Sequence, residues 1–257
     1  MPTDCHAHLS YKWFKNLSQV MKRAREAHLE AIINSCIIPE LYEKSILDAQ
    51  EFPDLYVSLG YAPAHIHKLD WPITIDLIRA NISKLVAIGE VGLDYYWIKD
   101  PLLQKKQRKI FEEVLDLTNE LGKPVFIHSR NAEEDVLSIL NRKAATQVIL
   151  HCFAGTLKQA KIVEEYGWLI SIPTAVTNRK KHRKIALKVP LEHLVVETDA
   201  PFLSPYPYVN KKAKNEPANV IYAIKEIAKL KDLDEKEVDR VTTQNVMKIV
   251  EGNYNIS

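Results

Sequence analysis

Four histidines and two carboxylates stand at the ends of short apolar segments, where they could bind metal ions. They are His6, His8, Glu90, His128, His151 and Asp199. His6 and His8 are two residues apart, so in an extended strand both side chains point to one face. A lone buried histidine is more often a packed core residue than a ligand, but six such side chains at equivalent positions favour a metal centre. Imidazole and carboxylate groups suit Zn, Mn, Co or Fe, and also Mg where carboxylates dominate.

Six ligands are too many for one closed tetrahedral ion, so we expect two divalent ions (Mg, Mn or Zn) that share a bridging ligand. Glu90 is the predicted bridge. Two ions about 3.5–4 Å apart would polarise a phosphoryl oxygen and generate a hydroxide from water. Asp199 could orient that water or take its proton, so Asp199 and Glu90 are the predicted catalytic residues.

Two further residues each lie two positions away from a candidate ligand. Arg130 follows His128 and could bind a phosphate in bidentate fashion, or it could form a salt bridge to a carboxylate such as Glu197. Glu197 precedes Asp199 and could orient a ligating histidine. It could equally be a simple ion-pair partner.

Basic clusters at residues 179–184 and 211–214 offer candidate substrate-binding cations, namely Lys180, Lys181, Lys211 and Lys212. The alternative is that these charges only lie on solvated helix faces. The segment 94–97 (Asp-Tyr-Tyr-Trp) could stack nucleobases, or it could form a packed loop, which is the favoured interpretation for Tyr95.

The elements that must position these residues alternate between strand and helix. Apolar, β-branched runs typical of buried parallel strands lie at 31–38, 55–60, 84–91, 124–128, 147–151, 168–172 and 193–197, after a first strand ending at His6 to His8. The clearest helix is 101–121, and 216–250 should hold two more. The strand ends recur about every 27 residues, close to the length of one strand–helix unit.

This pattern predicts a TIM (β/α)8 barrel that forms a single domain over residues 1–257. Such barrels build their sites at the carboxyl ends of the strands, where the six candidate ligands lie. The alternative, a doubly wound sheet, should show a glycine-rich phosphate turn after its first strand, and the sequence has none.

Composition limits the other possibilities. The chain of 257 residues has 35 basic and 33 acidic residues, so it does not resemble a histone-like nucleic-acid binder. Its three cysteines form no CxxC pair. No leader-like segment or long apolar run is visible, so we expect a cytoplasmic protein without a membrane contact or an obligate protein partner.

Five segments together resemble the signature blocks of the TatD family of metal-dependent deoxyribonucleases. They are residues 4–9 (DCHAHL), 89–96 (GEVGLDYY), 124–130 (PVFIHSR), 151–153 (HCF) and 197–201 (ETDAP), and residues 215–218 (NEPA) resemble a later block. The resemblance implies that His6 and His8 hold one ion, which Asp199 completes. It implies that His128 and His151 hold the second ion and that Glu90 bridges the two. It also implies magnesium-dependent hydrolysis of DNA, often from 3′ to 5′.

One departure and two alternatives stay open. The family usually has a histidine where Ala62 stands, and His65 or His67 could fill the space, although both could be loop residues that face water. The same centre could act on another ester, amide or phosphoester, such as an aminoacyl-tRNA ester. Related barrels often bridge their ions with a carboxylated lysine on strand 4, so Glu90 favours the nuclease. A non-catalytic binding protein would be expected to lose ligands, and all six are present.

Overall fold

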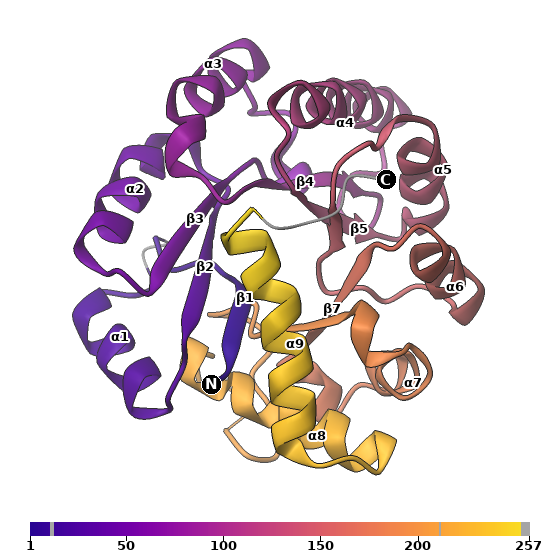
Figure 1. Cartoon of the computed structure of the whole chain (residues 1–257). Coiled ribbons are helices and arrows are strands. Elements are labelled where there is room, and N and C mark those ends of the chain that lie inside the picture. Colours follow the sequence, from indigo (N-terminus) through magenta and orange to yellow (C-terminus); the bar gives the residue numbers. More distant parts are fainter. Residues whose placement is uncertain (11–12, 211, 253–257) are drawn as a thin grey trace.

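The chain folds into a closed barrel of parallel strands surrounded by helices (Figure 1). The computed structural model describes residues 1–10, 13–210 and 212–252. Within these ranges, eight strands pair in chain order from β1 to β8, and every pair is parallel. The ring closes where His8 N donates to the carbonyl oxygen of Ala200 (2.7 Å) and Asp199 N donates to that of His6 (3.0 Å). The predicted TIM barrel is therefore confirmed.

Each segment predicted as a strand overlaps one. The strands are β1 Thr3–Ala7, β2 Ala31–Cys36, β3 Leu55–Leu59, β4 Ala87–Asp94, β5 Val125–Arg130, β6 Val148–Leu150, β7 Leu169–Pro173 and β8 Leu194–Glu197. Two strand ends were predicted two or three residues too early. Strand β4 runs to Asp94, so Glu90 lies inside the strand, and β5 runs to Arg130 beyond His128. The cause is mutual pairing, because the β4–β5 ladder continues as far as Asp94 and Arg130.

The helices follow the strands around the outside of the barrel (Figure 1). They are α1 Leu17–Glu26, α2 Tyr42–Glu51, α3 Trp71–Asn81, α4 Pro101–Leu121, α5 Glu133–Lys143, α6 Leu157–Glu165, α7 Lys180–Lys188, α8 Ile221–Lys231 and α9 Glu235–Val250. Helix α4 has the predicted bounds. Asp100 caps its first turn by accepting from Leu102 N, and Gly122 ends it in the left-handed conformation.

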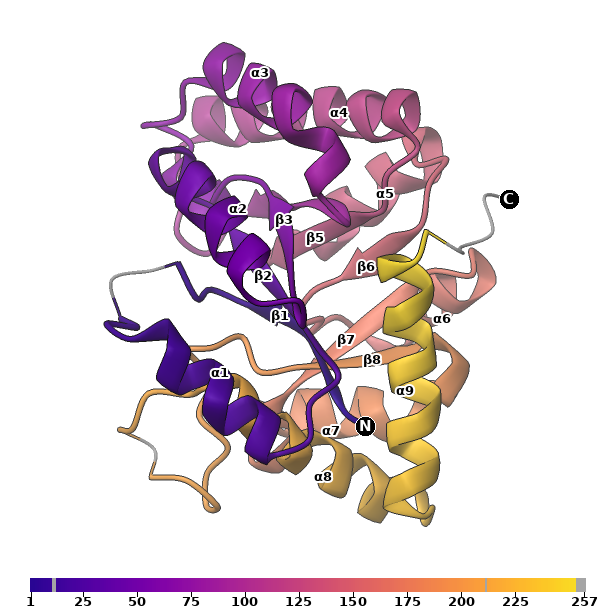
Figure 2. The same ribbon diagram turned by 60° about the vertical axis from the view of Figure 1, so that its left-hand side comes forward.

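Helix α9 covers the amino-terminal end of the barrel (Figures 1 and 2). Its residues Val246 and Ile249 pack against a buried layer of strand residues, which includes Ile33, Phe126 and Val195. This layer fills the barrel below the candidate ligands. The centre can therefore exchange with solvent only at the opposite end, where the loops leave the carboxyl ends of the strands. No helix in the described part of the chain has the length and apolar character needed to cross a membrane.

Candidate metal centre

The six predicted ligands converge at the carboxyl-terminal end of the barrel. His6 and His8 leave β1 on one face, as their spacing predicted, and their Nε2 atoms lie 3.3 Å apart. Both Nε2 atoms are directed at the same oxygen of Glu90 on β4, at 3.3 Å from His6 and 3.5 Å from His8. Three donor atoms therefore meet at one buried point, which is the arrangement that a cation would occupy.

Asp199 and His151 stand on the β8 side of this point. One oxygen of Asp199 lies 3.3 Å from His8 Nε2 and 3.8 Å from His151 Nε2. The rings of His6 and His151 stack with their centroids 3.8 Å apart. Asp199 is just past β8, with a φ of 55°.

His128 completes the group from β5 and brings in Asp94, for which the sequence indicated no part in the centre. Its Nδ1 lies 2.7 Å from the second oxygen of Glu90, so Glu90 reaches histidines on both sides. The other ring nitrogen, Nε2, lies 3.1 Å from Asp94. Asp94 is four residues beyond Glu90 on the same strand, so the even spacing was a usable signal. Predicting a strand that ended near Glu90 concealed it.

In three of the four histidines, the ring nitrogen that points away from the centre (the outer nitrogen) donates to an acceptor. This pattern tests whether the side chains suit a metal ion. A carbonyl oxygen can only accept, so His8 Nδ1 donates to Ser35 O (2.8 Å). The carboxylates of Glu197 and Asp94 accept from His151 Nδ1 (2.9 Å) and His128 Nε2 (3.1 Å). Each inner nitrogen is therefore directed into the centre, where it can ligate a cation once its proton is displaced. The residues fit a divalent cation.

Burial and mutual charge shift the pKa values of these groups. Burial alone would lower the pKa of His128, but the charge of Glu90 and the contact with Asp94 raise it to about 9. Burial likewise opposes the charge of Glu197, which raises the pKa of His151 to about 10. The pKa of Glu90 is held well below its usual range, because the nearby histidines outweigh the effect of burial. The carboxylate is therefore ionised, and a cation that binds here would displace protons from imidazoles.

The supporting residues take different positions. Glu197 is buried against His151, so the alternative in which it pairs with Arg130 is wrong. Arg130 is exposed at the end of β5, and its guanidinium lies 4.0 Å from the centre of the Tyr96 ring. Lys180 and Lys181 are exposed in the first turn of α7, and Lys212 is exposed in the loop after β8. Lys211 lies outside the described residues.

The loop after β4 contains both a packed and an exposed part. The hydroxyl of Tyr95 donates to Asp135 (2.6 Å), as the packed interpretation expected. Tyr96 and Trp97 are exposed beside the centre. Ala62 precedes a short turn at Pro63–His65, and His65 and His67 are both exposed.

Comparisons with known proteins identify one family. A family model described as TatD related DNase matches residues 3–251. A metal-dependent hydrolase of Methanocaldococcus jannaschii, itself uncharacterized, is 35% identical, with 95% of each chain covered. The human deoxyribonuclease TATDN3 is 29% identical, with 96% of this chain and 93% of the relative covered. The crystal structure of YjjV, a TatD homolog from Escherichia coli, has a TM-score of 0.88 at 25% identity, with 96% of each chain covered.

Proposed function

Because the chain belongs to the TatD-related DNase family, we propose that it hydrolyses DNA phosphodiester bonds from the 3′ end with two divalent ions. The membership confirms the predicted family and the predicted enzyme class, a metal-dependent hydrolase. The observation that carries the proposal is the convergence of four imidazoles and two carboxylates, three of the imidazoles with their outer nitrogen bound to an acceptor.

The proposed ligands divide into two groups that share Glu90. His6 and His8 face one oxygen of Glu90, and Asp199 adjoins His8 on the far side. His128 faces the other oxygen of Glu90, and His151 lies within the same group. A carboxylate whose two oxygens face separate histidine sets is suited to bridge two ions of Mg, Mn or Zn.

The protein's own groups would position water and substrate. When bound, divalent ions stabilise charge on a phosphoryl group and make water more acidic. Asp199 is partly exposed at the mouth, and its pKa is lowered because the contacts with His8 and His151 outweigh burial. An ionised carboxylate at this position can orient the attacking water and accept its proton. Glu90 is enclosed, so its catalytic part would be to hold the ions as the bridging ligand.

The exposed cations would bind the substrate. Arg130 stands two residues from His128 on the same strand, and we propose that it contacts a phosphate near the reacting bond. Lys180 and Lys181 begin α7, and Lys212 lies in the loop after β8. The sequence adds Lys211, which is outside the described residues. We propose that they bind more distant phosphates, so DNA affinity should fall steeply with salt.

The test is hydrolysis of DNA by protein stripped of metal and reloaded with Mg, Mn or Zn. We expect reloaded protein to release nucleotides from the 3′ end. Asp199→Asn should reduce the rate by roughly 10²–10⁴-fold, the usual contribution of a general base. Asp76→Asn on the exposed face of α3 removes the same charge away from the centre and should leave the rate unchanged.

Two other outcomes would be decisive. Hydrolysis of an aminoacyl ester or amide without cleavage of DNA would retain the metal centre and remove DNA as its substrate. If no metal restores hydrolysis of any of these bonds, the proposed chemistry is wrong.

A further inference from the structure

A single carboxylate joins the metal centre to an exposed aromatic loop. Asp94 accepts from His128 Nε2 through one oxygen, and its other oxygen accepts from Tyr96 N (3.0 Å) and Trp97 N (2.9 Å). The two rings stand edge to face, 4.9 Å apart, and they are 45% and 61% exposed. Arg130 lies against both rings, at 4.0 Å and 5.6 Å from their centres. We refer to these three side chains, Tyr96, Trp97 and Arg130, as the aromatic platform.

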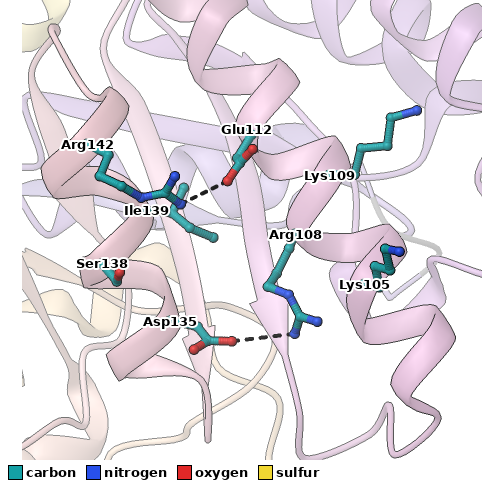
Figure 3. A pocket seen from close by; sticks show the side chains of 8 residues that line it. All are labelled: Lys105, Arg108, Lys109, Glu112, Asp135, Ser138, Ile139 and Arg142. Atoms are coloured by element: carbon teal, nitrogen blue, oxygen red, sulfur yellow. Dashed lines mark hydrogen bonds and ion pairs between the residues drawn. The ribbon is translucent and has the colours of Figure 1, made fainter.

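A basic groove lies between α4 and α5 (Figure 3). Its walls carry the cations Lys105, Arg108, Lys109 and Arg142 and the acids Glu112 and Asp135. Arg142 pairs with Glu112 at 2.9 Å, and Arg108 lies 3.5 Å from Asp135. Both of these acids are therefore already engaged by arginines. Lys109 lies 3.8 Å from Glu113 on the same helix, but this exposed pair is weak, so both lysines stay available to a phosphate along α4.

Tyr95 connects the aromatic platform to the basic groove. Its hydroxyl donates to Asp135 (2.6 Å) and accepts from Arg108 Nη1 (2.8 Å), and both residues line the groove. Tyr95 immediately precedes Tyr96 in the chain, so the platform and the groove adjoin. Both α4 and α5 begin at the carboxyl ends of strands. The groove therefore opens at the rim of the barrel on the same side as the metal centre.

We propose that the aromatic platform and the basic groove form one track for the DNA strand that extends from the reacting bond. This inference rests on the proposed function and adds a location for the part of the substrate outside the centre. A base would stack on Trp97 and Tyr96, since such contacts tolerate any base. The phosphates that follow would lie along Lys105 and Lys109, because a line of cations tracks a nucleic-acid backbone.

Substrate length and salt dependence test this track. The substrates are bis(p-nitrophenyl) phosphate, which can reach only the centre, and a labelled 15-nucleotide strand. We expect Lys105→Gln/Lys109→Gln to raise KM for the strand several-fold and to leave hydrolysis of the small diester unchanged. The slope of log Kd against log salt concentration should fall by about 1 for each lysine that contacts a phosphate. Lys229→Gln/Lys236→Gln, at the opposite end of the barrel, is the charge-matched control.

Trp97→Ala tests the aromatic platform separately. We expect it to weaken strand binding about tenfold regardless of base sequence. Tyr166→Ala removes an exposed aromatic ring near the amino-terminal end of β7 and should have no effect. Strand binding is measured by fluorescence polarisation with EDTA present as well as with metal, so it can be read in the absence of cleavage.

The outcomes separate this inference from the proposed function. If the groove variant matches its control in KM, Kd and salt slope, the track is wrong even when DNA is cleaved. An equal loss of activity on both substrates would mean that the variant disturbs the metal centre, and this result also contradicts the track. If the wild-type protein cleaves no DNA yet binds the strand with the predicted variant effects, the track stands and the proposed function fails.

Discussion

The carboxylates behind the histidines define how the candidate centre is held. Asp94 and Glu197 each accept from the outer nitrogen of one histidine, and each lies on a barrel strand. Both are buried, so neither side chain can rotate freely into solvent. The arrangement fixes the ring orientation of His128 and His151 before any ion arrives and turns the inner nitrogen of each ring toward the centre.

Asp94→Asn should weaken divalent-metal binding about 10- to 100-fold, the usual effect of removing such a partner. The amide keeps the shape of the side chain but loses the charge that orients His128. Isothermal titration with Mn²⁺ measures the effect. Asp70→Asn, at the start of α3, replaces a carboxylate that only caps a helix and should leave the metal affinity unchanged. Equal affinities for wild type and Asp94→Asn would exclude the orienting role.

His182 predicts a separate dependence of stability on pH. Burial, assisted by the charge of Arg179, lowers its pKa to about 4. Its folded pKa is below the unfolded value of about 6.5, so the unfolded chain binds the proton more readily. The stabilising contribution is complete above pH 6.5 and is lost as the pH falls toward 4.

Urea unfolding at pH 7 and pH 5 tests this dependence with His182→Gln. From pH 7 to pH 5, the free energy of unfolding should fall by about 2 kcal/mol more for the wild-type protein than for the variant. His67→Gln, which removes an exposed imidazole, should follow the wild type. Parallel pH dependence of wild type and His182→Gln would contradict the assignment.

At the scale of elements, close contact between β4 and β5 sets the position of Glu90 against His128. Gly92 pairs with His128 in the ladder and has a φ of +136°. A Cβ atom on Gly92 would lie 2.2 Å from the carbonyl oxygen of His128. The strands can approach this closely only because Gly92 has no side chain.

Gly92→Ala should therefore destabilise the protein by roughly 3 kcal/mol or more, because it adds a clash to an unfavourable backbone conformation. Gly122→Ala is the matched comparison. Gly122 also has a positive φ (+60°), but a Cβ there meets nothing within 4 Å. Gly122→Ala should lower the free energy of unfolding by only about 1 kcal/mol. Chemical denaturation measures the stability of both variants. Equal losses of stability would show that the strands shift to relieve the clash at Gly92.

At the scale of the whole molecule, the candidate ligands come from β1, β4 and β5 and from residues just beyond β1, β6 and β8. A bound ion would link strands that are distant in the chain, and it would bind only the closed barrel. Helix α9 seals the other end, so ion binding and the packing of α9 act on opposite ends of one structure.

Metal binding should accordingly stabilise the folded chain. A free Mn²⁺ concentration of about 100 times Kd should raise the free energy of unfolding by about 2.7 kcal/mol. This increase corresponds to a rise of roughly 5–10 °C in Tm. EDTA should reverse the shift. Glu90→Gln removes the shared carboxylate and should show a much smaller shift in a thermal scan. An equal increase in wild type and Glu90→Gln would place the binding ions elsewhere.

The sequence by itself determined the alternation of strands and helices, the bounds of α4 and the six candidate ligands. It could do so because buried parallel strands require continuous apolar runs. The spacing of two between His6 and His8 specifies a shared face in any extended segment. The resemblance to one family followed from the same residues.

Only the tertiary structure decided which side chains meet. Three contacts join separate elements: the hydrogen bond from His128 to Asp94, the platform formed by Arg130 with Tyr96 and Trp97, and the packing of α9 across the barrel. Such contacts depend on strand register and loop path. Register is set by pairing between neighbouring strands, so a pattern within one segment cannot specify it.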